Sequence, residues 1–251
     1  MERLTSLKNP KVQLWRSLKD GKARRETGLF LVEGVRMVEE ALASGWTVEA
    51  LLLQEGEKTP AGVQAPVYVL PEVVLSAICD TKSPQGIAAV LRSRSAMLLR
   101  PEQGIWAALD GVQDPGNVGT IIRTADAAGL AGILLSPTCA DVHSPKVLRA
   151  TMGSFFRMPL LETENLPAFL RELREEGFSI LSSELGGTSF YERKQVSAKA
   201  VLVIGNEGNG ISAPVRAVAT HHLALPMRGG AESLNAAVAA GIMMYELMRA
   251  Y

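Results

Sequence analysis

The chain has 251 residues, of which 47% are hydrophobic and 21% are charged, a composition that allows one large or two modest globular cores. Its formal net charge is zero, so no global field attracts a polyanion and any contact with nucleic acid must come from local charge. Cys79 and Cys139 lack the spacing of a disulfide framework or a structural metal site, which favours a reducing compartment.

The hydrophobic pattern gives no sign of a membrane segment. The first ten residues contain no apolar core of a signal peptide, and the longest nearly apolar run, 236–245, is far shorter than the roughly 20 residues that span a bilayer. We therefore expect a cytoplasmic protein that does not enter the membrane.

The first 25 residues form a basic segment, with eight Lys or Arg against two acidic residues. The basic residues are Arg3, Lys8, Lys11, Arg16, Lys19, Lys22, Arg24 and Arg25. We predict a basic helix over 10–26, after Pro10. Charge alone leaves two interpretations open, a solvated helix or an arm that faces RNA.

Strands and helices then alternate up to Ser93. Apolar spacing predicts strands at 29–34, 47–54, 67–70 and 86–93, and helices at 35–44 and from Pro71. Residues 94–104 have no clean period and contain charge, Pro and Gly, so we place a domain boundary there.

The pattern restarts at residue 105. It predicts strands at 105–110, 132–136, 156–161, 178–183, 200–205 and 221–226, with helices at about 118–128, from Pro145, at 166–177, at 213–220 and from Ser233. This alternation predicts a mostly parallel sheet that is covered by helices on both faces.

Three loops follow predicted strands, where an open α/β sheet places its ligands. They lie in the segments 110–129, 201–212 and 223–235. The second is rich in glycine, but its G-x-x-G-x-G spacing is not the dinucleotide fingerprint and it lacks the Lys of a phosphate-binding loop. A nicotinamide or nucleotide-triphosphate enzyme is therefore a poor fit.

The same loops carry a family resemblance. The segments NVGTIIRTADAAG (117–129), LVIGNEGNGIS (202–212) and LPMRGGAESLNAAVAAGIMMYE (225–246) resemble, in order and spacing, the three signature motifs of the SpoU or TrmH-like RNA ribose 2′-O-methyltransferases. Residues 29–93, with FLVEGVRMVEEAL and SPQGIAAV, are similar to the substrate-binding domain of members that act on ribosomal RNA.

The resemblance implies a specific architecture and activity. We expect an N-terminal α/β RNA substrate-binding domain at 1–95, a linker at 96–104, and at 105–251 an α/β parallel-sheet domain with a C-terminal deep trefoil knot. The expected enzyme is a homodimer that methylates the ribose 2′-hydroxyl of RNA from S-adenosylmethionine. We expect no metal, because none of the three histidines lies in a matched motif.

The motifs also assign residues to the catalytic cluster. Arg123 matches the family's essential arginine, although a guanidinium is a reluctant base. Asn117 and Ser233 could each be a simple helix cap, and Glu207 a lone exposed carboxylate. Asn235 has no structural explanation if the last helix begins at Ser233. By resemblance, all five form the active site.

The resemblance places the cofactor against the loops around Gly205, Leu225 to Met227, and Leu234, because apolar side chains and backbone groups suit an adenine pocket. The N-terminal domain favours ribosomal RNA as the substrate, by analogy. Two alternatives remain, a transfer RNA 2′-O-methyltransferase and a catalytically silent RNA-binding protein of the same fold.

Overall fold

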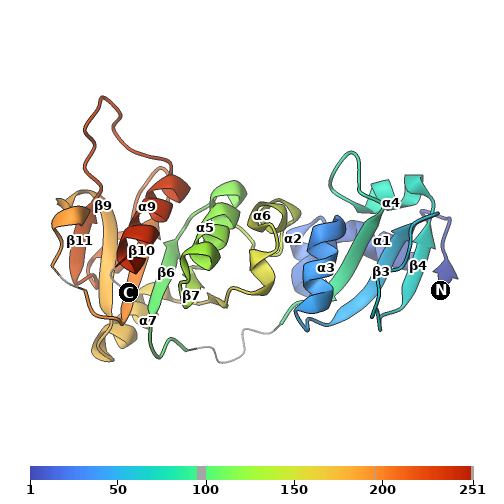
Figure 1. Ribbon diagram of the computed structural model, residues 1–251, viewed down its shortest axis with the longest axis horizontal. Helices are drawn as coiled ribbons and strands as arrows, with labels where there is room; N and C mark the ends of the chain where they lie inside the picture. Colours follow the sequence, from blue (N-terminus) through green and yellow to red (C-terminus); the bar gives the residue numbers. More distant parts are fainter. Residues whose placement is uncertain (95–99, 195, 250–251) are drawn as a thin grey trace. The chain divides into compact units, whose positions relative to one another are not determined.

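Two separate β-sheets organise the chain, which the computed structural model describes over residues 1–94, 100–194 and 196–249. Each sheet belongs to one of two compact units (Figure 1). The first unit contains Met1–Ser95 and Asp141–Phe156, and the second contains Ala96–Ala140 and Arg157–Tyr251. Part of the predicted linker at 96–104, residues 96–99, lies outside the described residues.

The first unit is a five-stranded mixed sheet with helices packed on it. Its elements are β1 (Glu2–Arg3), α1 (Pro10–Ser17), α2 (Gly21–Thr27), β2 (Leu29–Glu33), α3 (Val35–Ala43), β3 (Val48–Gln54), β4 (Val67–Leu70), α4 (Glu72–Ile78), β5 (Ile87–Arg92), α6 (Pro145–Thr151) and the 3₁₀ helix η1 (Ser154–Phe156). The strand order is β1-β4-β3-β5-β2, with β5 antiparallel to both β2 and β3. These strands confirm the element pattern predicted for residues 29–93.

The predicted single helix over 10–26 is wrong, because the chain bends at Leu18–Asp20 between α1 and α2. The Asp20 side chain accepts a hydrogen bond from the Lys22 backbone N–H at 2.8 Å and so caps a new helix. Leu18 is fully buried. The bend therefore interrupts the helix, but it allows Asp20 to cap α2 and Leu18 to be buried.

Residues 141–156 complete the apolar core of the first unit. The ring of Phe30 on β2 lies 4.8 Å from His143 and 5.7 Å from Phe155, measured between centroids. Trp46 packs against Phe155 and Phe156. Phe30 is fully buried, so without this segment a large aromatic surface of the first unit would face water.

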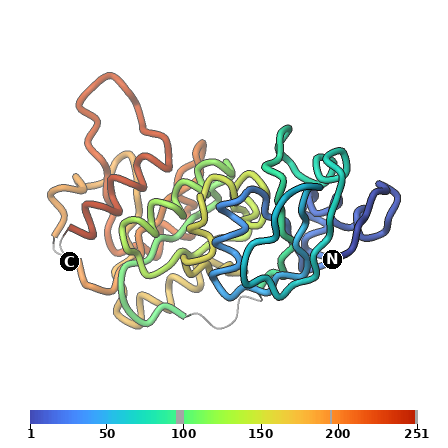
Figure 2. The backbone as a smooth tube through the Cα atoms, turned by 45° about the vertical axis from the view of Figure 1, so that its right-hand side comes forward, coloured from blue at the N-terminus to red at the C-terminus, as the bar shows by residue number. Residues whose placement is uncertain are grey.

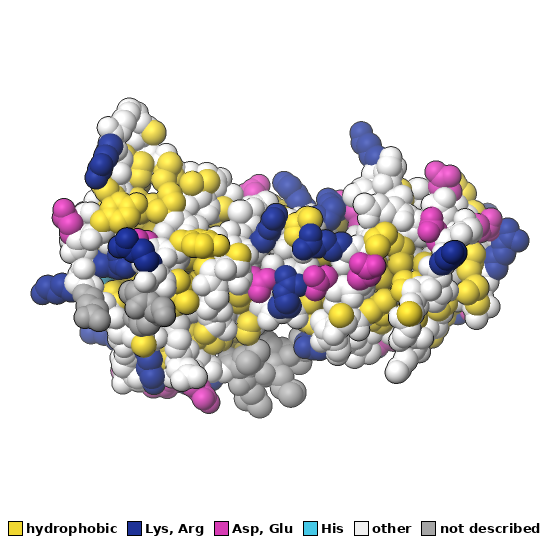
Figure 3. Space-filling model, viewed as in Figure 1, with side chains coloured by type: hydrophobic (Ala, Val, Ile, Leu, Met, Phe, Trp, Pro, Cys, Tyr) yellow, Lys and Arg dark blue, Asp and Glu magenta, His cyan; other side chains and the backbone are white. Residues whose placement is uncertain are grey.

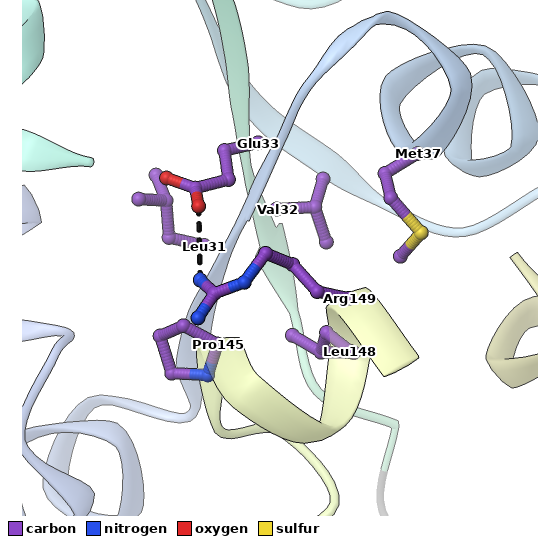
Figure 4. Close-up of a pocket in the computed structure, with 7 residues that line it drawn as sticks. All are labelled: Leu31, Val32, Glu33, Met37, Pro145, Leu148 and Arg149. Carbon is purple, nitrogen blue, oxygen red and sulfur yellow. Dashed lines mark hydrogen bonds and ion pairs between the residues drawn. The ribbon is translucent and has the colours of Figure 1, made fainter. Parts of the chain in front are cut away.

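A small cavity of about 10 Å³, room for roughly one water molecule, lies between β2 and α6 (Figure 4). At its rim, Arg149 Nη1 donates to Glu33 Oε1 at 2.9 Å. Arg149 Nη2 donates to Asp80 Oδ2, also at 2.9 Å. One guanidinium thus ties α6 to β2 and to the loop after α4.

A second arginine makes a less exposed ion pair. The Arg24 side chain is only 7% exposed, and its Nη2 lies 2.6 Å from Asp141 Oδ2. Its Nη1 donates to the carbonyls of Leu18 and Lys19. Burial works against the Asp141 charge, but hydrogen bonds from His143 and Arg24 outweigh burial and hold the pKa of Asp141 well below its usual range.

The second unit is a six-stranded sheet in the order β11-β9-β10-β6-β7-β8. Its elements are β6 (Ile105–Asp110), α5 (Pro115–Ala128), β7 (Gly132–Leu135), β8 (Leu160–Glu162), α7 (Leu166–Glu175), β9 (Ser179–Ser189), the 3₁₀ helix η2 (Phe190–Glu192), β10 (Ala200–Gly205), α8 (Ala213–Arg216), β11 (His221–Ala224) and α9 (Ala236–Met248). All of its strand pairs are parallel, which confirms the predicted parallel sheet.

Helices cover this sheet because its central strands are apolar on both faces. On one face, side chains of α7 and α8 join a buried cluster with Ala108 of β6 and Val203 of β10. The helices α5 and α9 pack side by side (Figure 2). No helix among the described residues is long and apolar enough to cross a bilayer.

The predicted strand at 156–161 is mostly wrong. Residues Ser154–Phe156 form η1 instead, since Phe155 and Phe156 are buried in the aromatic cluster of the first unit. β8 begins only at Leu160. A tertiary contact far away in the sequence therefore overrides the local strand pattern.

We predict that Arg24→Ala lowers the free energy of unfolding by about 3 kcal/mol, because it removes the buried partner of the Asp141 ion pair and leaves two backbone carbonyls without their donor. Urea denaturation would measure the change. The matched control is Lys22→Ala, whose ion pair with Glu26 spans 3.8 Å between exposed side chains and should be worth about 0.5 kcal/mol or less. Equal losses in the two variants would contradict this account.

Candidate functional site

The candidate site forms where β6 and β10 end beside each other. Their parallel register pairs Asp110 with Gly205, the last residues of the two strands. The loops that leave them, 111–114 and 206–212, therefore begin at the same edge of the sheet. Ser212 N donates to Asp110 Oδ2 at 2.7 Å, which ties the far end of the second loop back to β6.

Glu207 joins these two loops. Its carboxylate accepts hydrogen bonds from the backbone N–H groups of Gln113 at 3.2 Å and Asp114 at 3.1 Å. It also accepts one from Asn117 Nδ2 at 2.9 Å. Burial opposes its charge, but the bonds from Asn117 and from the backbone outweigh burial and hold the pKa of Glu207 below its ordinary value. Glu207 is therefore an anion whose oxygens accept hydrogen bonds from the first loop.

The third loop is connected through Asn117. Asn235 Nδ2 donates to Asn117 Oδ1 at 2.9 Å. Because a carboxylate can only accept, Glu207 fixes which way the Asn117 amide points, and that amide in turn requires a donor from Asn235. Residues 207, 117 and 235 thus form one chain of hydrogen bonds across the three motifs, which we call the Glu207–Asn117–Asn235 relay.

The helix starts differ from the prediction in both motifs. α5 begins at Pro115, and its cap is Asp114, whose side chain accepts from the Asn117 N–H. Asn117 is thus the third residue of the helix. α9 begins at Ala236, and Asn235 caps it by accepting from Ala237 and Val238. The prediction that the last helix begins at Ser233 is wrong, and Asn235 has a structural role after all.

The structure adds three residues that the sequence analysis left out. Asp110, Asp114 and Asn206 all bond the loops of the site. An Asp before a Pro at the start of a helix is a recognised cap signal, so Asp114 could have been found. No local sequence pattern predicts a role for Asp110 or Asn206 in the site, because their hydrogen-bond partners are about a hundred residues away.

Arg123 lies on α5 with its side chain exposed. Its guanidinium makes no hydrogen bond or ion pair with any residue in the described part of the chain. It lies six residues beyond Asn117, about 9 Å along the helix axis. Helix α5 therefore carries both Asn117, the middle residue of the relay, and the unpaired guanidinium of Arg123.

The predicted cofactor residues lie at two strand ends. A side chain at Gly205 would collide with the backbone of Gly210 and Ile211, because the loop folds back through hydrogen bonds between Asn206 and Gly210. Leu225 directly follows β11 and is half-buried.

Met227, Ser233 and Leu234 follow in the loop between β11 and α9. Met227 is half-buried, and Leu234 is 38% exposed. Partly open apolar side chains beside free backbone groups fit a ligand with an adenine ring. Ser233 is exposed. Within the described ranges, no group of three or more His, Cys, Asp or Glu could hold a metal ion.

Comparison with known families decides the identity of this fold. Residues 104–245 match the SpoU rRNA Methylase family. The chain belongs to this family. Residues 9–89 match a second family description, the MRM3-like substrate binding domain.

Full-length relatives of this SpoU methylase agree. The chain is 39% identical, over 98% of its length and 99% of the relative's, to the 23S rRNA (guanosine(2553)-2′-O)-methyltransferase RlmP of Bacillus subtilis. It is 35% identical to the AdoMet-bound rRNA methyltransferase of Sinorhizobium meliloti, with a TM-score of 0.89, covering 99% of this chain and 98% of that one. The SpoU methyltransferase AviRb of Streptomyces viridochromogenes, solved with AdoMet, is 28% identical at a TM-score of 0.88 and covers 97% and 98%.

These matches confirm the predicted family and the predicted fold class. The fold class is an N-terminal domain followed along the chain by an α/β domain with a deep trefoil knot. They also confirm the predicted enzyme class, an RNA 2′-O-methyltransferase, and S-adenosylmethionine as its cofactor. The assignment of individual site residues stays a prediction.

We predict that Asn235→Ala lowers the free energy of unfolding by about 1 kcal/mol through loss of the α9 cap, and that it also abolishes most methyl transfer. Asn235→Asp keeps the cap acceptor but cannot donate to Asn117, so stability should recover while activity stays low. Urea denaturation and a methyl-transfer assay measure the two effects.

The control for this prediction is Asn165→Ala, which removes the equivalent cap of α7 and should cost stability alone. Full activity of Asn235→Asp would show that the donor to Asn117 is dispensable.

Proposed function

We propose that this SpoU methylase transfers the methyl group of S-adenosylmethionine to a ribose 2′-hydroxyl of ribosomal RNA. The observation that carries the proposal is the Glu207–Asn117–Asn235 relay, which gathers all three motifs at one edge of the sheet. Ribosomal RNA is favoured over transfer RNA because the N-terminal part matches a substrate-binding domain, and because two of the relatives named above, those of Bacillus subtilis and Sinorhizobium meliloti, are rRNA methyltransferases.

Arg123 is the residue that we assign to the RNA. A guanidinium stays protonated at neutral pH, so it serves poorly as a base but well as a phosphate ligand. Held beside the ribose, its charge would lower the pKa of the 2′-hydroxyl and stabilise the developing alkoxide. Arg123 can take this role because no described side chain neutralises it, unlike Arg157, which pairs with Asp126 at 2.8 Å.

The relay has a different role, which is to hold the site rigid. Its Asn117 and Asn235 amides are occupied by one another and by Glu207. They therefore position α5, which carries Arg123, relative to α9 and the loop before it. Ser233 has an exposed hydroxyl two residues before Asn235, and we assign it to the RNA side of the site.

The residues that would hold S-adenosylmethionine are the backbone at Gly205 and the side chains of Leu225, Met227 and Leu234. When bound, the cofactor supplies an electrophilic methyl group on a sulfonium. The half-buried Leu225 and Met227 would cover an adenine ring and exclude water from it. Gly205 also allows the loop to fold back on itself, since a side chain there would collide with the backbone of Gly210 and Ile211.

We further propose the domain division of 1–95, 96–104 and 105–251, with the first domain binding RNA. The family matches at 9–89 and 104–245 support this division. Residues 141–156 depart from it in one respect, since they pack within the first compact unit. A ribosomal RNA substrate also implies the cytoplasm as the place of action.

The basic arm is smaller than the sequence suggests. Five of its eight cations are already engaged, and these are Arg3 with Glu55, Lys11 with Glu2, Lys19 with the Ala77 carbonyl, Lys22 with Glu26, and Arg24 with Asp141. Lys8, Arg16 and Arg25 are exposed and pair with no described side chain. These three cations are the ones that we assign to RNA phosphates.

We also propose a homodimer that forms through α9. Val238, Ile242 and Tyr245 are 51%, 37% and 55% exposed, and their spacing of four and three places them on one face of the helix. Hydrophobic side chains gather over this region in Figure 3. A two-fold axis would let this apolar face pack against its own copy, close to the relay residue Asn235 that caps the same helix.

We predict that Arg123→Ala lowers methyl transfer by about 100-fold or more and leaves S-adenosylmethionine affinity within about twofold, as expected if Arg123 acts on the RNA. The assay is transfer of tritiated methyl to total RNA from a strain that lacks the protein, followed by mapping of alkali-resistant sites. Arg171→Ala, an exposed arginine on α7, is the control.

The outcomes of this assay are distinct. Label in 23S ribosomal RNA that requires Arg123 supports the proposal. Label in transfer RNA favours the alternative of a transfer RNA 2′-O-methyltransferase. Absence of both methyl transfer and donor binding by calorimetry in the wild type would indicate a silent RNA-binding protein.

We predict that Ile242→Glu converts the dimer to a monomer, because it places a charge in the apolar interface. Analytical ultracentrifugation measures the mass of each variant. Val73→Glu replaces an even more exposed apolar residue, 67% exposed on α4, and should leave the dimer intact. A monomeric wild type, or a dimeric Ile242→Glu, contradicts this interface.

A further inference from the structure

We propose that Asn206 is a positioning residue for the methyl-transfer site, acting by locking the two loops that Glu207 joins. The inference rests on the proposed function, because it concerns the same site. Asn206 lies next to Glu207 in the loop after β10, and its side chain reaches the other loop independently.

The side chain of Asn206 uses both ends of its amide. Its Nδ2 donates to the Gly111 carbonyl at 2.8 Å. Its Oδ1 accepts from the N–H groups of Gly208 and Asn209, each at 3.0 Å. The first bond crosses between loops, and the other two close a turn within its own loop.

Gly111 is the residue where this cross-loop bond has most effect. Its φ of 73° suits a glycine and begins the turn out of β6. Its N–H donates to Ser136 Oγ at 2.9 Å, so Ser136 after β7 holds the N–H of Gly111 and Asn206 after β10 holds its carbonyl. The start of the loop is thereby fixed from both neighbouring strands.

The remainder of the loop depends on this fixed start. Two and three residues later, the N–H groups of Gln113 and Asp114 donate to Glu207. Two adjacent side chains after β10 therefore hydrogen-bond to the loop 111–114 at two places. Asn206 bonds to the beginning of that loop, and Glu207 bonds to its end. Glu207 is exposed, so it competes with water for these two N–H donors. Its hydrogen bonds therefore depend on Asn206, which holds the loop so that the donors stay within reach.

The test compares Asn206→Ala and Asn206→Asp with Asn209→Ala, which removes an exposed amide three residues away in the same loop. Asn206→Asp keeps the acceptor for the turn but loses the donor to Gly111. Both Asn206 variants should lower kcat by about 10-fold or more and leave KM for RNA and S-adenosylmethionine affinity within about twofold. Asn209→Ala should match the wild type.

A double variant separates positioning from general destabilisation. If Asn206 acts through Glu207, adding Asn206→Ala to Glu207→Gln lowers the rate by less than the product of the single effects. A fully multiplicative loss would overturn the inference. So would an Asn206→Asp variant with the wild-type rate, because that result assigns the role to the turn alone.

Amide hydrogen exchange at Gln113 and Asp114 gives a readout that needs no activity. Both amides should exchange faster in Asn206→Asp than in the wild type or in Asn209→Ala, while core amides of β6 stay protected. Unchanged exchange overturns the inference even if the enzyme is active. An inactive wild type with the expected exchange pattern would instead refute the proposed function and leave the positioning role standing.

Discussion

The site of this SpoU methylase depends on one carboxylate that accepts three hydrogen bonds, two from another loop and one from the helix that follows that loop. Glu207 receives the N–H groups of Gln113 and Asp114 and the amide of Asn117. These donors favour its charged form over burial, so the anion and the loop stabilise each other. Through Asn117, the same anion requires Asn235 to donate a hydrogen bond, and Asn235 caps α9. One charge thus couples the three signature motifs.

This arrangement separates the groups that hold the site from those that remain available for RNA. The relay amides are consumed by one another, whereas Arg123 on the same helix pairs with no described residue. Hydrogen bonds, and not a cation, stabilise the Glu207 charge, so no ion pair with Glu207 competes with a phosphate for Arg123. The first unit shows the same separation of roles. Paired cations such as Arg24 stabilise the fold, whereas Arg16 and Arg25 stay exposed.

The sequence predicted most of the strands and the parallel sheet, because buried parallel strands are long apolar runs such as 105–110 and 200–205. It also placed Asn117, Glu207 and Asn235 in one site, through the family motifs. It failed where a distant partner decides the outcome. The strand expected at 156–161 yields to aromatic packing, the basic helix bends at Asp20, and the role of Asn206 depends on a carbonyl 95 residues away.

The central claim is that Glu207 is an anion held by the opposite loop, and its pKa tests this most directly. The measurement is an NMR titration of the Glu207 carboxyl carbon in the wild type and in Asn117→Ala. The account predicts a wild-type pKa below the ordinary value of about 4.3, and a higher pKa in the variant because one donor to the charged form is lost. A pKa at or above the ordinary value that does not respond to Asn117→Ala would contradict it.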